Sequence, residues 1–188
     1  MNFEELESAV RACRKCPLCL VRTNAVLERG SRSALLMFVG EAPGEKEDET
    51  GIPFVGPAGQ LFDKYLAAAG IDRDEAYICN ILKCRPPRNR DPEPGEQDAC
   101  MDFLRAQVRL VQPRIIVCLG RISAMRLISP DLKITRDHGK FYEKGKFLMT
   151  AHYHPSALLR DASKKEDALR DMLALAEKYE EIKTGKSV

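Results

Sequence analysis

The sequence predicts a three-layer α/β domain with a central four-stranded parallel sheet between helices. Four short apolar segments, bounded by Gly, Pro or charged residues, have the pattern of buried parallel strands. Helical stretches separate them, and this alternation is typical of crossover connections within one sheet. The length of 188 residues, with 44% apolar and 31% charged residues, fits one such domain. We expect it at residues 1–183, with a disordered tail at residues 184–188.

The individual elements follow from local signals. The strands are expected at residues 34–39, 76–82, 114–119 and 146–151. Apolar residues recur at three- and four-residue steps in the first and last helices, and Gly70, Pro113 and Pro130 close the helices between them. The helical stretches are expected at residues 3–13, 59–69, 96–111, 121–128 and 169–176.

Charge and hydropathy exclude several classes of protein. With 30 Lys+Arg against 28 Asp+Glu, the net charge of +2 indicates no polyanionic partner unless the cations are clustered. No apolar run approaches the roughly 18 residues that span a bilayer, and the acidic start at residues 1–10 does not resemble a signal peptide. We therefore expect a cytoplasmic monomer that does not contact membranes.

Four of the seven cysteines have spacings that indicate a metal centre. Because the expected cytoplasmic compartment is reducing, the seven cysteines are not interpreted as disulfide partners. Cys13 and Cys16 form a C-x-x-C pair, and Cys84 and Cys100 have fifteen residues between them. Four thiolates can hold either zinc or an iron–sulfur cluster. The wide second spacing favours a [4Fe–4S] cluster, with zinc as the alternative.

The other three cysteines carry weaker signals. Cys79 and Cys118 lie inside apolar strand segments, so we interpret them as core residues. Cys19 is either a spare thiol or an alternative ligand. The segment at residues 84–95 has four Pro, three Arg and no apolar period, and loops of this length are often functional.

Polar and aromatic residues follow the predicted strands, where ligands bind in open α/β sheets. The first strand leads into the turn at residues 40–44, which offers backbone N–H groups and the Glu41 carboxylate but matches no nucleotide-phosphate motif. The second strand ends near Asn80, whose amide can both donate and accept. Pro155 turns the chain after the fourth strand and leaves His154 at the sheet edge. With Phe54, these residues predict one crevice above the sheet.

The sequence resembles the uracil-DNA glycosylase superfamily, in particular its iron–sulfur family 4. The matching stretches are GEAPGEKEDETGIPFVGPAGQLFDKYL, NILKCRPPRNRDP and HPSALLR, together with the four cysteines. The resemblance covers nearly the whole chain and implies a parallel sheet between helices. It also implies an enzyme of base excision repair that flips uracil out of DNA and hydrolyses its N-glycosidic bond, leaving an abasic site.

The resemblance also implies roles for individual residues. Phe54 would stack on the uracil, Asn80 would bind its Watson–Crick edge, and His154 would face uracil O2. Gly40 and Ala42 would supply backbone contacts.

The resemblance and the chemistry of the residues together predict the catalytic and DNA-binding residues. Glu41 occupies the position of the acidic catalytic residue, and Leu158 that of the residue wedged into the base stack. His154 would share in catalysis by stabilising the uracil anion. The basic residues that we expect to contact phosphates are Arg85, Arg88, Arg90 and Arg160.

Two alternatives are compatible with these motifs. One is a relative that traps uracil sites covalently through a His in an inserted loop, but residues 84–100 contain no His, so we expect turnover. The other is a non-catalytic iron–sulfur or zinc module that binds nucleic acid. Family 5 relatives carry an apolar residue where this chain has Glu41, which favours family 4.

Overall fold

One mixed sheet forms the centre of the protein. The computed structural model describes residues 1–185 and places six strands in the order β1-β3-β2-β4-β6-β5. The four predicted strands are present and mutually parallel: β2 (Leu36–Gly40), β3 (Tyr77–Asn80), β4 (Ile115–Leu119) and β6 (Phe147–His152). The predicted parallel core is therefore confirmed. The total of four strands was too low, because one antiparallel strand is added at each edge.

The two edge strands have no buried-strand pattern. β1 (Glu28–Gly30) pairs with β3 and contains two charged residues among its three. β5 (Phe141–Lys144) pairs with β6 across a two-residue turn, in which Gly145 has a φ of +61°. Both strands are partly exposed, so their sequences lack the apolar run that marks the central strands.

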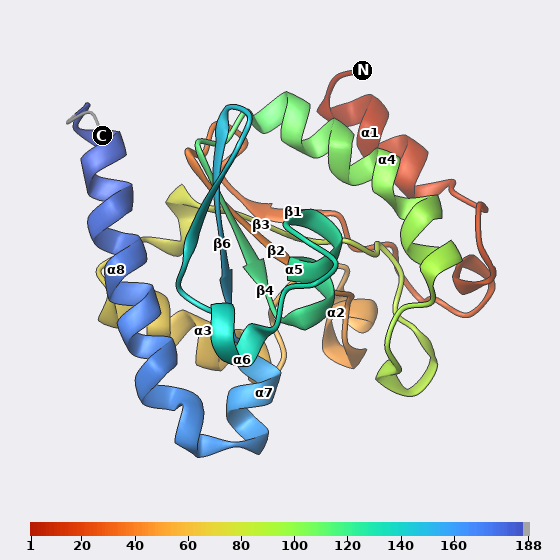
Figure 1. Ribbon diagram of the computed structural model, residues 1–188. Helices are drawn as coiled ribbons and strands as arrows, with labels where there is room; N and C mark the ends of the chain where they lie inside the picture. The colour runs from red at the N-terminus through yellow and green to blue at the C-terminus, as the bar shows by residue number, and fades with distance from the viewer. Residues whose placement is uncertain (186–188) are drawn as a thin grey trace.

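Helices cover both faces of the sheet (Figure 1). α1 (Phe3–Arg11), α4 (Pro94–Val111) and α5 (Arg121–Leu127) pack on one face. α3 (Pro57–Ala68) and α8 (Lys165–Lys183) pack on the other. These are the five predicted helices, and together with the sheet they form the predicted three layers.

Short helices occupy the connections and were not predicted. They are α2 (Glu45–Thr50), α6 (Ile134–Asp137) and α7 (Pro155–Arg160), with 3-10 turns η1 (Pro17–Leu20), η2 (Arg73–Glu75), η3 (Pro87–Asn89) and η4 (Ala162–Lys164). Segments of three to six residues are too short to show a helical apolar period. In Figure 1, α2, α6 and α7 lie at the end of the sheet toward which the parallel strands point.

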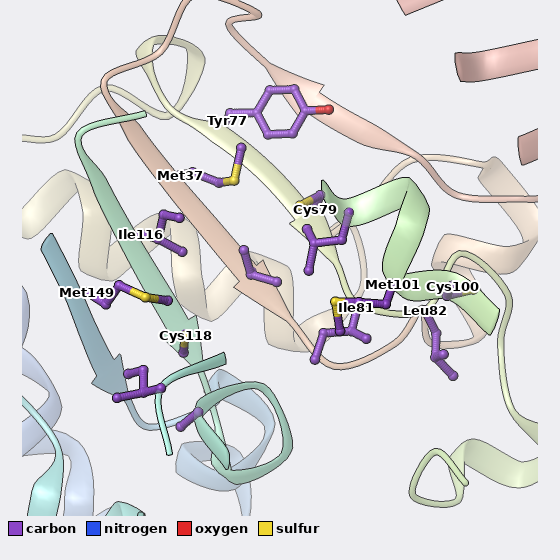
Figure 2. Close-up of a cluster of buried hydrophobic side chains, with 14 of the residues drawn as sticks. Met37, Tyr77, Cys79, Ile81, Leu82, Cys100, Met101, Ile116, Cys118 and Met149 are labelled. Atoms are coloured by element: carbon purple, nitrogen blue, oxygen red, sulfur yellow. The ribbon is translucent and has the colours of Figure 1, made fainter. Parts of the chain in front are cut away.

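The core beneath α4 is rich in sulfur-containing residues. Figure 2 shows Met37, Tyr77, Cys79, Ile116, Cys118 and Met149 among its side chains. Cys79 and Cys118 are fully buried within strands, as expected of core residues. Burial raises the pKa of these two thiols to about 11 and about 12 respectively, so both stay protonated at neutral pH.

The end of the chain is described only in part. The predicted tail begins at Thr184, whose hydroxyl donates to the carbonyl of Glu180 at the end of α8. Residues 186–188 of that prediction lie outside the described residues. Over residues 1–185, no helix combines the length and apolar character needed to cross a bilayer.

Candidate active site

The predicted crevice exists at the carboxyl ends of the parallel strands. A cleft of about 650 Å³ opens there, and residues from distant parts of the chain line it. Because β2, β3, β4 and β6 run in parallel, the residues that follow them meet at one edge of the sheet. The lining includes five of the six predicted catalytic and base-binding residues: Glu41, Ala42, Phe54, Asn80 and His154.

Two glycines allow these side chains to approach one another. A Cβ on Gly40 would lie 2.3 Å from Asn80 Oδ1 and 2.8 Å from Phe54 Cζ. Gly40 therefore lies beneath the cleft, where it makes room for the amide and the ring. A Cβ on Gly120, at the end of β4, would lie 2.9 Å from the Cβ of His154.

An aromatic ring and an imidazole lie close together in the cleft. The ring centroids of Phe54 and His154 are 5.9 Å apart, and the Phe54 centroid is 5.4 Å from that of Phe62 in the core behind it. Only 5% of Phe54 is exposed. A flat ring held in this way offers one face on which a planar base can stack.

Asn80 supplies an acceptor that its surroundings do not satisfy. Its Oδ1 is buried and has no hydrogen-bond partner within the described part of the chain. Its backbone carbonyl accepts from the buried Lys83 ammonium, and the backbone N–H of Ile81 donates to the carbonyl of Gly40. The backbone at Asn80 is thus fixed, and the oxygen of its side-chain amide is available to a ligand.

The hydrogen bonds of His154 define where its proton lies. Its Nδ1 accepts from the backbone N–H of Ser156 at 3.1 Å and lies 2.7 Å from the Ser156 hydroxyl. Burial lowers the pKa of His154 to about 4, so the ring is neutral near pH 7. A neutral ring whose Nδ1 accepts carries its proton on Nε2, which makes Nε2 a donor.

Glu41 has the perturbed acidity expected of a general base. Burial and, secondly, the negative charge of Asp91 raise its pKa to about 7. The positive charges of Arg121 and Arg160 act in the opposite direction. A carboxylate with this pKa can take up and release a proton near neutral pH.

The sequence reasoning did not include Arg121. It follows Gly120 at the end of β4, lines the cleft, and forms an ion pair with Asp91 at 2.7 Å. Its position just after a predicted strand could have identified it, because predicted site residues also lie at the ends of the other three parallel strands.

The four predicted phosphate contacts differ in their surroundings. Arg90 and Arg160 line the cleft, whereas Arg85 and Arg88 do not. Arg90 donates to both carboxylate oxygens of Glu96, at 2.9 and 2.6 Å, so its guanidinium is already engaged. Arg88 and Arg160 are exposed.

Leu158, the residue predicted to wedge into the base stack, has a buried side chain. Its side chain is 2% exposed and belongs to a core cluster with Tyr153 and Ala168. Leu159 is 52% exposed and lines the cleft. Both residues lie on α7, where neighbours point about 100° apart, so Leu158 turns inward and Leu159 outward.

The four predicted metal ligands come from three segments of the chain. Cys13 follows α1, Cys16 precedes η1, Cys84 follows β3, and Cys100 lies on α4. Cys16, Cys84 and Cys100 belong to or pack against one core cluster, and burial raises the pKa of each thiol. Within residues 1–185, no three His, Cys, Asp or Glu side chains lie close enough to hold a single metal ion.

Arg22 connects these segments. Its Nη1 donates to Cys84 Sγ at 3.1 Å, and its Nη2 donates to the carbonyls of Arg11 and Cys13 at 2.6 and 3.3 Å. One guanidinium therefore joins the end of α1 to the loop that follows β3.

The residues that line the cleft lie within a segment that matches a known protein family. The sequence profile of the Uracil DNA glycosylase superfamily matches residues 27–176, which include every lining residue named above. A type-4 uracil-DNA glycosylase of Archaeoglobus fulgidus is 43% identical over 184 residues, covering 94% of this chain and 92% of that protein. One of Thermotoga maritima is 44% identical over 164 residues, covering 86% and 85%.

A more distant relative helps to place the chain within the superfamily. A type-5 uracil-DNA glycosylase of Pyrobaculum aerophilum is 33% identical over 147 residues, covering 69% of this chain and 64% of that protein. The type-4 relatives match more residues at higher identity and along most of their own length. The chain therefore belongs to the uracil DNA glycosylase superfamily and, within it, to the type-4 uracil-DNA glycosylases.

Proposed function

We propose that this protein releases uracil from DNA by hydrolysing the N-glycosidic bond of deoxyuridine, which starts base excision repair. The observation that carries the proposal is the convergence of Glu41, Phe54, Asn80 and His154 on one cleft. The type-4 relatives are named as uracil-DNA glycosylases. The substrate is DNA, and the monomer is the proposed acting unit because one chain supplies the whole cleft.

Phe54 and Asn80 bind the extruded base. The uracil ring stacks on Phe54, which is buried against Phe62 and cannot turn away easily. Asn80 Oδ1, the buried acceptor without a partner within residues 1–185, takes the N3–H of uracil. The same amide donates through Nδ2 to uracil O4. Ala42 at the cleft wall supplies a backbone contact, and Gly40 makes room for the Asn80 amide and the Phe54 ring.

His154 stabilises the negative charge that develops on the departing base. Its ring is neutral near pH 7 and its Nε2 carries the proton, so Nε2 donates to uracil O2. The ring is already oriented by Ser156 and needs no rearrangement during reaction. A donor placed in this way lowers a barrier by roughly 3–4 kcal/mol.

Glu41 acts on the opposite side of the bond. Its ionised carboxylate orients the attacking water, takes up a proton from it, and stabilises the positive charge on the sugar. With a pKa of about 7, the carboxylate is ionised in about half of the molecules near neutral pH.

Base extrusion and DNA binding use the rim of the cleft. Leu159, and not the buried Leu158, is the apolar side chain that can fill the gap left in the base stack. Arg160 and Arg121 at the rim, with the exposed Arg88, provide phosphate contacts. Arg85 and Arg90 are assigned a supporting part, since they hydrogen-bond Asn89 and Glu96 within the same segment.

A [4Fe–4S] cluster is the proposed cofactor, with Cys13, Cys16, Cys84 and Cys100 as its ligands and zinc as the alternative. Four thiolates are a donor set that such a cluster accepts. The cysteines come from three segments, and three of them belong to or pack against one core cluster. The cluster would join the loop at residues 84–100 to the N-terminal helix and takes no part in the chemistry.

A uracil-containing duplex tests the function. Incubation followed by alkali cleaves the strand at uracil if the base is released. An intact strand with tight binding indicates a binding module, and a protein–DNA band that resists SDS indicates covalent trapping. For the cofactor, brown protein with broad visible absorption indicates iron–sulfur, whereas colourless protein with stoichiometric zinc contradicts it.

A further inference from the structure

Phe54 has a backbone conformation that aromatic residues rarely adopt. Its φ is +55°, in the left-handed region that favours glycine. Such a conformation persists only where the surrounding contacts enforce it, and it concentrates at functional sites. The groups that hold this peptide therefore control where the ring lies.

A buried carboxylate holds the residues that follow the ring. Glu47, on α2, is 8% exposed, and its Oε1 accepts from the backbone N–H groups of Val55 and Gly56 at 2.9 and 2.7 Å. A Cβ on Gly56 would lie 3.2 Å from this same oxygen. The turn after Phe54 is thus fixed to α2.

A guanidinium holds the carbonyl of Phe54 itself. Arg73, on η2, donates through Nη2 to the carbonyl oxygens of Phe54 at 2.7 Å and Pro53 at 3.3 Å. Its Nη1 forms an ion pair with Asp63 on α3, and only 12% of its side chain is exposed. Arg73 does not line the cleft, so it acts on the site only through the backbone of residues 53 and 54.

The backbone of α3 closes the remaining side. A Cβ on Gly59 would lie 2.0 Å from the carbonyl oxygen of Phe54. The Phe54 peptide is therefore enclosed by α2, η2 and α3, and its ring rests on Phe62, itself part of α3.

We propose that Arg73, anchored by Asp63, and Glu47 are positioning residues for uracil excision, because together they hold Phe54 in the conformation that presents its ring to the base. The inference rests on the proposed stacking role of Phe54. Loss of Arg73 would let the peptide relax and move the ring, which slows the step after DNA binding. Misplacement of a substrate-positioning group by about 1 Å can cost about 100-fold in rate.

A double-mutant cycle tests this coupling. The single-turnover excision rate is measured for the parent protein, Arg73→Ala, Phe54→Ala and the double variant. We expect Arg73→Ala to slow excision about 10- to 100-fold in the parent background and less than about twofold in the Phe54→Ala background. The Kd for a uracil-free oligonucleotide, measured by fluorescence anisotropy, should stay unchanged, because Arg73 lies outside the cleft.

The outcomes separate the inference from the function on which it rests. A parent protein that does not release uracil overturns the proposed function. Phe54→Ala at the parent rate overturns the stacking role and the positioning role with it. A slow Phe54→Ala combined with a fully additive effect of Arg73→Ala overturns the positioning role alone.

Two further variants test the positioning role in case Arg73→Ala does not fold. Asp63→Asn keeps the guanidinium but removes its anchor. Arg73→Lys keeps one charge without the planar fork that reaches the carbonyls through Nη2 and Asp63 through Nη1. Both should give intermediate rates with a melting temperature close to that of the parent. Arg105→Ala removes an exposed Arg–Asp pair on α4 and is the matched control, expected at the parent rate. Parent rates in both test variants would contradict the positioning role.

Discussion

The cleft and the cysteine region both collect residues from distant parts of the chain, but they are held together differently. In the cleft, groups of the protein itself hold several of the residues: Ser156 orients His154, Lys83 holds the backbone carbonyl of Asn80, and Gly40 makes room for the Asn80 amide. In the cysteine region, the hydrogen bonds to thiols include those from the Arg22 side chain to Cys84 and from the backbone N–H of Lys15 to Cys13.

This difference indicates separate tasks for the two regions. A preorganised site lowers a barrier because its dipoles need not move during reaction. The thiols of Cys84 and Cys100 are buried and have raised pKa values, and a bound metal group would add cross-links between the segments that carry them. Changes in the cleft should therefore affect rate, and changes at the cysteines should affect stability.

The largest expected effect is on rate, from Glu41→Gln. The substitution keeps the shape of the side chain but removes the base, and we expect excision to slow by about 10²- to 10⁴-fold. The melting temperature should change little or rise, since Glu41 is a partly buried carboxylate whose side chain has no hydrogen bond within residues 1–185. Single-turnover assays and thermal melts measure the two quantities.

If Glu41→Gln lowers both the excision rate and the melting temperature, the separation of tasks between the cleft and the cysteine region is contradicted. A Glu41→Gln protein that keeps the parent rate removes Glu41 from the mechanism. One that melts many degrees lower assigns Glu41 a structural role instead.

The next effect is on stability, from Cys84→Ala. With Cys84 as a ligand of the proposed cluster, its loss should release the metal and cost on the order of 3 kcal/mol, which for a chain of this length is about 6–12 °C in Tm. Cys118→Ala, at a thiol buried in β4, is the matched control and should cost about 1 kcal/mol with iron content unchanged. Equal losses of stability with constant metal content would identify both cysteines as packing residues only.

A smaller effect should separate two neighbouring leucines on α7. Leu159→Ala should slow excision from duplex DNA about five- to tenfold, with less effect on single-stranded DNA, because only a duplex has a stack to fill. Leu158→Ala should instead cost about 2–4 kcal/mol of stability, since its side chain is in the core. Assays on both substrates, with thermal melts, compare the two. The reverse pattern would restore the wedge role to Leu158.

Much of the fold was predictable from the sequence. The central strands are buried on both faces, so each shows as an apolar run with clear ends, and Asn80 and His154 could be placed at strand ends from that pattern. The edge strands β1 and β5 were missed because their pairing depends on a neighbour and not on their own apolar pattern.

Other features depend on three-dimensional contacts that no sequence pattern records. Leu158 and Leu159 are chemically identical, and only the rotation of α7 against the core decides which of them is exposed. The left-handed backbone of Phe54 likewise depends on Glu47 and Arg73, which lie 7 residues before it and 19 residues after it. Family resemblance assigns a position, whereas the orientation of a side chain comes from packing.

The smallest effect concerns the acidity of Glu41 and should appear as opposite shifts in a pH profile. Burial and then Asp91 raise the pKa of Glu41 to about 7, so excision should increase with pH through about 7 as the carboxylate ionises. Asp91→Asn removes a charge that raises this pKa and should move the rising limb to lower pH. Arg121→Gln removes a charge that lowers it and should move the limb to higher pH. Both residues are exposed, so each shift should be less than about one unit and shrink with salt. Single-turnover excision rates between pH 5 and pH 9 measure these shifts. Shifts of both variants in the same direction would show that the rise of the rate with pH reports a group other than Glu41.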